Sequence, residues 1–137
     1  MADKATKSAR YETGMAMRRR VLGDAHVDRS ERNSTAFDEP FQDLITEAAW
    51  GTVWSSPQWA PSQRSIVVLA ILASLGREEE FALHLRATRN TGASREDIRE
   101  ALMHVAIYAG APAANTAFAM AKRIFAEMDV DQEKDDA

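Results

Sequence analysis

The segment that best indicates the fold of this chain is residues 77–112, REEEFALHLRATRNTGASREDIREALMHVAIYAGAP. Apolar side chains recur in it at helical spacing in two runs, which predicts helices over residues 78–90 and 95–109. Gly92 and Gly110 follow the two runs, and glycine is a typical residue just past the end of a helix. The segment therefore predicts two consecutive helices with defined stops.

The helical pattern continues upstream of this segment. Ser94 and Asp97 resemble a capping arrangement at the start of the second helix, with aspartate in place of the usual glutamate. A very apolar helix is predicted over residues 63–75, with Ser62 as its cap and Gly76 as its stop. These signals predict a run of short helices rather than isolated ones.

The first half of the chain is less regular. A first helix is predicted over about residues 10–22, followed by a polar loop over 23–36. Asp38 is expected to cap a second helix that continues through Ala48. Residues 50–60 are aromatic-rich and are expected to form a connection.

The chain as a whole is expected to be all-α, with about six helices in a single domain. No sustained two-residue alternation or hairpin turn indicates a strand. The last helix is expected over 113–128, so the domain spans residues 10–128. Residues 1–9 are expected to be a flexible N-terminus, and the charged tail 129–137 is expected to be disordered.

The composition excludes several classes of function. The net charge of −4 gives no support to binding of nucleic acid or of an anionic membrane surface. The absence of cysteine excludes disulfides, thiolate nucleophiles and cysteine-ligated metals. The longest apolar run, residues 66–75, is too short to span a bilayer, and the polar N-terminus is unlike a secretory signal. A cytoplasmic protein without a membrane segment is expected.

The predicted helix 63–75 also indicates self-association. It is apolar almost all round, and such a helix must be buried on every side. A subunit interface would achieve this more easily than a small domain. A homo-oligomer is therefore expected.

Glu80 and His84 are the first candidates for chemistry. They lie four residues apart, so on a helix they share one face and can exchange a proton. The plainer interpretation is a solvated face whose glutamates favour the helix dipole. His84 lies between Leu83 and Leu85, with Phe81 one turn back, so it is expected to be partly buried and to need a partner.

Three further residues, Arg64, Arg77 and Tyr108, are candidates for binding a ligand. Arg64 stands just inside a helix start, where a cation is better explained by an anionic ligand or a buried carboxylate than by the dipole. Arg77 lies one turn before Glu80. Tyr108 lies at a helix end beside Gly110, where backbone can approach a ligand closely.

The first half of the chain adds a polar segment and an aromatic group. His26, with Asp24 and Asp28, is in principle able to hold a metal, but no further ligands stand at recognisable spacing and no metal is expected. The segment is either a surface turn or a substrate-binding loop. Trp50 and Trp54 are either a hydrophobic lid or a plug in the core.

Taken together, these motifs resemble the carboxymuconolactone decarboxylase family, which shares its helical fold with the alkylhydroperoxidase D proteins. The matching motifs are Arg64-Ser65, the pair Glu80 and His84, Thr91-Gly92 and the run YAGAP from Tyr108, and the match covers about residues 41–126. Upstream, RRVLGDAHVDR at 19–29 resembles the start of the decarboxylases proper. The cysteines of the peroxidase branch would fall at Arg77 and Glu80, so thiol chemistry is not implied.

The resemblance implies an enzyme that removes CO2 from a dianionic unsaturated lactone and yields an enol-lactone, in protocatechuate breakdown by the β-ketoadipate route. The lactone carries its own electron sink, so no cofactor is expected. The resemblance also implies an oligomer, since the family is often hexameric. Alternative expectations are a lactone hydrolase or isomerase, and a non-catalytic helical binding protein.

The resemblance also suggests roles for the candidate residues. His84, tuned by Glu80, would be the proton donor, although the two roles can be exchanged. Arg64 would hold one substrate carboxylate, with Arg77 as a weaker candidate for the second. The remaining candidates would form the rest of the pocket: Tyr108 or His26 as donor to the lactone oxygen, and Trp50 and Trp54 as apolar walls.

Overall fold

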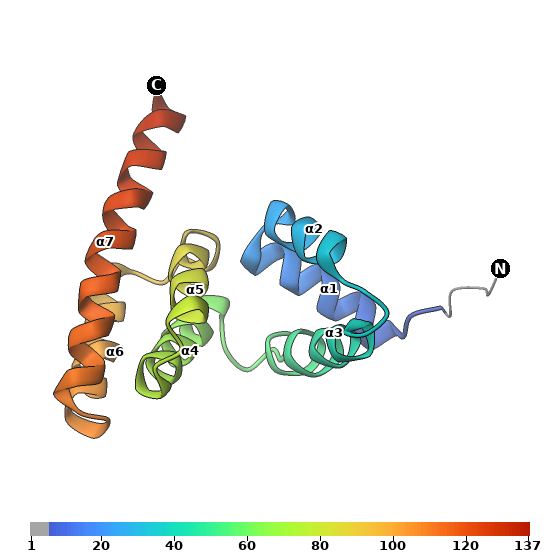
Figure 1. Ribbon diagram of the computed structural model, residues 1–137, viewed down its shortest axis with the longest axis horizontal. Helices are drawn as coiled ribbons and strands as arrows, with labels where there is room; N and C mark the ends of the chain where they lie inside the picture. Colours follow the sequence, from blue (N-terminus) through green and yellow to red (C-terminus); the bar gives the residue numbers. More distant parts are fainter. Residues whose placement is uncertain (1–5) are drawn as a thin grey trace. The chain divides into compact units, whose positions relative to one another are not determined.

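The computed structural model describes residues 6–137, and all regular structure in this range is helical. It contains seven α-helices and one π-helical segment, against about six helices predicted, and the all-α class is confirmed. The chain divides into two compact units, Met1–Trp59 and Ala60–Ala137, which are described separately below (Figure 1). The prediction of one domain over residues 10–128 stays a prediction.

The N-terminal unit is built around α1 (Ala9–Leu22) and the π-helix η1 (Thr46–Val53). The two segments pack closely because two glycines meet the partner backbone. A β-carbon on Gly14 would lie 2.1 Å from the carbonyl oxygen of Thr46, and one on Gly51 would lie 2.4 Å from that of Arg10. Only glycine fits such an approach of two backbones.

The predicted loop over residues 23–36 is wrong, because it contains the helix α2 (Asp24–Asn33). Gly23 has a φ of 88°, which ends α1 and lets the next helix begin at once. The guanidinium of Arg19 then pairs with Asp24 at 3.1 Å and Asp28 at 2.9 Å. Val27 is the one buried residue of α2, so the helix has almost no apolar pattern by which to recognise it.

The predicted cap at Asp38 is also wrong in its contacts. Asp38 does precede α3 (Glu39–Ile45), and Pro40 lies in its first turn as expected. The carboxylate instead turns back and accepts from the Thr35 N–H at 2.7 Å and the Ser34 hydroxyl at 3.1 Å. Asp38 therefore stabilises the preceding turn, a common alternative for aspartate.

The residues expected to form an aromatic connection are partly helical. The π-helix η1 includes Trp50, and its last turn is closed by a bond of 2.8 Å from the Trp54 N–H to the Ala49 carbonyl. The two indole rings stack with centroids 5.1 Å apart, and each side chain is only 6% exposed. This burial favours the core plug over the lid for both tryptophans.

The C-terminal unit consists of four helices (Figure 1): α4 (Pro61–Leu75), α5 (Glu78–Thr91), α6 (Arg95–Tyr108) and α7 (Ala111–Asp136). The stops at Gly76 and Gly92 are confirmed, with both residues in the left-handed conformation. The core between the helices is apolar and includes Leu69, Phe81, Leu85, Ile98, Leu102 and Ile124.

Two helix ends differ from the prediction. Ser62 does not cap α4, because the helix begins at Pro61 and the Gln63 side chain accepts from the Ala60 N–H at 2.8 Å. Proline is well suited to the first helical position, since its missing N–H has no partner there anyway. The last helix does not end near residue 128 but continues through the predicted disordered tail to Asp136. The predicted flexible N-terminus falls mostly outside the described residues.

The cap of α6 is confirmed, since the Ser94 hydroxyl accepts from the Asp97 N–H at 3.0 Å. Replacing Ser94 with alanine is therefore expected to lower the free energy of unfolding by about 1 kcal/mol. Ser74→Ala is the matched control, because that hydroxyl only donates to the Ala70 carbonyl within α4. Urea titration of both variants measures the difference, and equal stabilities would contradict the role of the cap.

The apolar helix α4 is buried on one face only within this chain. Leu69 and Ala73 are buried, whereas Val67, Ile71 and Leu75 follow one another at four-residue spacing and are exposed. Leu75 is 66% exposed. The sequence-based prediction of burial on every side is therefore not met by the chain alone.

Candidate functional site

Arg64 lies in the first turn of α4 and is largely buried, with 9% of its surface exposed. The next residue, Ser65, is fully buried, and its hydroxyl oxygen lies 2.7 Å from that of Thr91. This contact joins the start of α4 to the end of α5, so the two helices run antiparallel. A buried guanidinium in the first turn of a helix is not explained by the helix dipole, and this position makes Arg64 a candidate for contact with an anion.

His84 lies in the middle of α5 and is half-buried, as its sequence neighbours predict. Its Nδ1 atom is fully buried, and Phe81 and Leu85 beside it belong to the core. Glu80, one turn earlier, is exposed. The helix thus holds the imidazole at the edge of the core, while a coupling between Glu80 and His84 stays a prediction.

The helical hairpin separates the two candidate arginines. Arg77 lies at the turn between α4 and α5, whereas Arg64 lies at the opposite end of α4. At about 1.5 Å per residue, the axis of α4 between these ends measures roughly 18 Å. The two arginines therefore start from opposite ends of the hairpin, and His84 lies between these ends.

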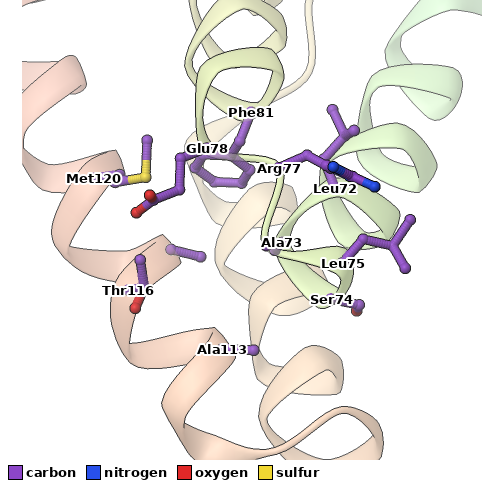
Figure 2. A pocket seen from close by; sticks show the side chains of 12 residues that line it. Leu72, Ala73, Ser74, Leu75, Arg77, Glu78, Phe81, Ala113, Thr116 and Met120 are labelled. Atoms are coloured by element: carbon purple, nitrogen blue, oxygen red, sulfur yellow. The ribbon is translucent and has the colours of Figure 1, made fainter.

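A cavity of about 390 Å³ opens beside Arg77, at the end of α4 and against α7. Figure 2 shows the carboxylate of Glu78 directed toward Met120 and Thr116, while the guanidinium of Arg77 lies on the α4 side. One cation and one anion at the rim do not favour a dianionic ligand, because Glu78 would repel it.

Tyr108 is the last residue of α6 and is 88% exposed. Gly110 follows with a φ of 112° and separates α6 from α7. Ile107 beside it is also exposed. The phenol thus belongs to the surface of the C-terminal unit and not to the cavity beside Arg77.

The other three candidates lie in the N-terminal unit. His26 is half-buried in α2, and its pKa is lowered chiefly by burial and further by the charges of Arg18 and Arg29. The imidazole is therefore neutral near pH 7. Asp24 and Asp28 pair with Arg19, and the described residues contain no cluster of three or more ligand side chains suited to a metal ion.

Three further polar residues lie near His26. Arg29, Ser30 and Asn33 line the same cleft as His26, on one face of α2. Ser30 and Asn33 were not among the sequence-based candidates, because they share a face with His26 only when the segment is helical. The structure thus distributes the candidates over two units, with Arg64, Arg77, Glu80, His84 and Tyr108 in one, and His26, Trp50 and Trp54 in the other.

Within residues 6–137, no helix combines the length and the hydrophobicity required to cross a bilayer.

Comparison with known proteins extends the resemblance found in the sequence. Over 125 residues the chain is 42% identical to a 4-carboxymuconolactone decarboxylase of Acinetobacter baylyi, covering 91% of this chain and 93% of that protein. It is 37% identical over 118 residues to a nitrosuccinic acid decarboxylase of Metarhizium robertsii, covering 86% of this chain and 82% of that protein. A 4-carboxymuconolactone decarboxylase of Pseudomonas putida is 52% identical over 42 residues, which cover 31% of this chain and 88% of that protein.

The model of the carboxymuconolactone decarboxylase family matches residues 39–123, which is more than half of the chain. The predicted resemblance, over about residues 41–126, is thereby confirmed. This chain belongs to the carboxymuconolactone decarboxylase family.

Proposed function

We propose that this protein is a 4-carboxymuconolactone decarboxylase, which releases CO2 from a dianionic unsaturated lactone and forms the enol-lactone in protocatechuate catabolism. The observation that carries the proposal is the 42% identity, over nearly the whole of both chains, to a relative with that name. The second relative is also named as a decarboxylase of a diacid, which supports the reaction class independently of the lactone ring.

The reaction requires little beyond binding and one proton. The bond between the γ-carbon and the leaving carboxylate breaks, and its electron pair passes through the ring double bond into the lactone carbonyl. The resulting dienolate then takes one proton at the α-carbon. CO2 and a monoanionic enol-lactone are the products, so each turnover consumes one proton.

Three features of the site would lower the barrier. A cation would hold the substrate carboxylate. Hydrogen-bond donors near the lactone oxygen would stabilise the developing negative charge, and each such donor is worth about 3–4 kcal/mol in well-studied enzymes. A general acid would protonate the carbon, with a typical effect of about 10²–10⁴-fold. In our proposal Arg64 is the cation, His84 is the acid with Glu80 beside it, and Tyr108 or His26 serves the lactone oxygen.

A homo-oligomer is part of the proposal. The exposed apolar side chains of α4, from Val67 to Leu75, would be covered by another copy of the chain, as would Met103 and Ile107 on α6. The hexamer typical of the family and the cytoplasmic location expected from the sequence both stay predictions.

The function is tested by measuring CO2 release from freshly generated 4-carboxymuconolactone with and without the purified protein. Acceleration that survives a chelator supports the proposal. Loss of the lactone without CO2 would favour a hydrolase or isomerase, and no change would favour another substrate or a binding protein. Nitrosuccinate is the second substrate to test, since its nitro group can accept the electron pair in place of the lactone carbonyl.

Arg64→Ala is expected to lower kcat/KM for CO2 release about 30-fold, mainly through KM. The loss of one charge-assisted carboxylate contact costs about 2 kcal/mol, and every 1.4 kcal/mol is a factor of ten. Arg77→Ala is the control with the same change of charge, and it should stay within about threefold because Arg77 is exposed at the opposite end of α4. Arg64→Lys, with circular dichroism of every variant, separates lost charge from lost folding.

An Arg64→Ala variant that stays folded and within threefold of the parent would contradict the anion contact. A larger loss in Arg77→Ala than in Arg64→Ala would move the carboxylate to the other end of the hairpin.

A further inference from the structure

The N-terminal unit contains a small polar cleft between α2 and the segment that leads into α3. Its volume is about 280 Å³, which suits a small organic acid better than a drug-sized ligand. Four of its lining residues come from α2 at positions i, i+3, i+4 and i+7, so they form one continuous helix face. The residues that line the cleft are His26, Arg29, Ser30, Asn33, Asp38 and Gln42.

The α2 face is rich in hydrogen-bond donors. Arg29 supplies an exposed guanidinium, and Asn33 supplies an amide NH2. Ser30 is turned into a donor by its surroundings, because its hydroxyl oxygen already accepts from Arg18 Nη2 at 2.9 Å. The hydroxyl proton is still available for donation.

Arg18, in α1, places a buried positive charge next to this face of α2. Its side chain is buried, with 7% of the residue exposed, and it lies between α1 and α2. Its second nitrogen, Nη1, lies 3.5 Å from Glu31, a carboxylate outside the cleft. The low exposure of the guanidinium means that its field is only weakly screened by water.

The pKa of His26 depends on the charges around the cleft. Burial lowers its pKa, and the charges of Arg18 and Arg29 lower it further. The neutral imidazole retains one N–H, so it too can donate. An anion placed among these cations would offset their effect and raise the pKa of His26.

Asp38 is the single carboxylate among the residues lining the cleft. Its oxygen Oδ1 accepts from the Thr35 N–H and the Ser34 hydroxyl, and the first of these bonds is the chief reason that its pKa is lowered. Asp38 is therefore charged at neutral pH and opposes an anion. Arg29 offsets the charge of Asp38, and Arg18 behind the cleft is paired with Glu31, so the neutral donors of the cleft decide which ligand it can bind.

We propose that this cleft is a carboxylate-binding site, in which Arg29 is the principal cation and Ser30, Asn33 and His26 donate hydrogen bonds to a small organic acid. The ligand class follows from the planar guanidinium and the neutral donors that line the same cleft, which match the oxygens of a carboxylate. Binding alone tests the proposal, so it does not depend on the decarboxylase activity.

The experiment is an NMR titration of the full chain with succinate as the probe, against sodium chloride at equal ionic strength. The chain has three histidines, so the ring signals of His26 can be assigned by a single substitution. Succinate is expected to raise the pKa of His26 in a saturable manner. His104 serves as the internal reference, because it is exposed on α6 and belongs to neither proposed site.

Three variants test the geometry of the site. Arg29→Gln is expected to weaken succinate binding about tenfold, because it removes the principal cation. Asp38→Asn is expected to strengthen it severalfold, since the amide oxygen can keep the bonds from Thr35 and Ser34 without the charge. Arg32→Gln is the matched control on the same helix, because Arg32 does not line the cleft, and it should change affinity less than twofold.

The proposal is overturned if succinate leaves the pKa of His26 unchanged relative to chloride. It is equally overturned if Arg29→Gln and Arg32→Gln weaken binding by the same factor, which would show a general effect of net charge. CO2-release assays then distinguish whether the organic acid bound in the cleft is the substrate or a different molecule. A raised KM in Arg29→Gln identifies the substrate as the ligand, and an unchanged KM with lost succinate binding identifies a different acid; both results support the site.

Discussion

His84→Ala is expected to lower kcat for CO2 release from 4-carboxymuconolactone by at least about 100-fold. In the proposed mechanism this imidazole delivers the proton that the dienolate takes up, and a positioned general acid contributes about 10²–10⁴-fold. The half-buried position of His84 in α5 favours it over exposed Glu80 as the group that meets the substrate. Glu80→Gln should therefore lose less than His84→Ala.

The matched control is His104→Ala, on the neighbouring helix α6. His104 is exposed, and its Nδ1 lies 2.8 Å from the Glu100 carbonyl of its own helix. The two variants remove the same side chain, but only His84 belongs to the proposed site. Rates in both should be measured at saturating substrate, together with thermal unfolding to exclude a loss of structure.

A stable His84→Ala variant within about threefold of the parent enzyme would remove His84 from the mechanism. If Glu80→Gln then lost more activity, the roles of the two residues would be exchanged, an alternative that the sequence leaves open. The pH dependence of kcat in the parent and in Glu80→Gln would show whether the carboxylate tunes the acid.

Gly14→Ala is expected to lower the free energy of unfolding of the N-terminal unit by about 3 kcal/mol. Helix propensity alone predicts the opposite, a gain of about 1 kcal/mol for alanine over glycine inside a helix. The added β-carbon, however, would lie 2.1 Å from the Thr46 carbonyl oxygen and 2.8 Å from the Gly51 nitrogen. Both atoms are backbone, so α1 must move away from η1, and overpacking of this kind costs about 1–3 kcal/mol or more.

The control for this substitution is Thr13→Ala, at the exposed neighbouring position of α1. It should change stability by less than about 0.5 kcal/mol. Gly51→Ala, whose β-carbon would meet the Arg10 carbonyl at 2.4 Å, should cost about as much as Gly14→Ala. The double variant should cost less than the sum, because one displacement of α1 relieves both contacts. Full additivity, or a stabilised Gly14→Ala, would contradict the close packing.

The sequence predicted the C-terminal helices well because their signals are local. Gly76 and Gly92 stop their helices through a left-handed backbone conformation, and Ser94 caps the next helix through a contact only three residues away. The N-terminal unit was harder, since α2 is polar and Val27 is its only buried residue. Asp38 does not cap α3 because its carboxylate accepts from Thr35 and Ser34, and Ser62 does not cap α4 because the helix already begins at Pro61.

The family was also accessible from the sequence, since its motifs are patterns of residue type and spacing. The arrangement of the candidate site was not. Spacing placed Glu80 beside His84 and offered a solvated face as the plainer interpretation, which the exposure of Glu80 supports. Spacing did not indicate that Arg64 and Arg77 occupy opposite ends of a hairpin. The donor face of α2 was missed because its spacing becomes meaningful only once the segment is known to be helical.

The sequence by itself determined the helical class, the ends of most helices in the second half and the family. Each of these depends on interactions within a few residues, or on patterns that survive without a structure. The tertiary structure alone decided the burial of Arg64, the exposed stripe of α4 and the close contact at Gly14. Burial and contact depend on which faces of distant segments meet, and the free energy of that packing is not encoded at any single position.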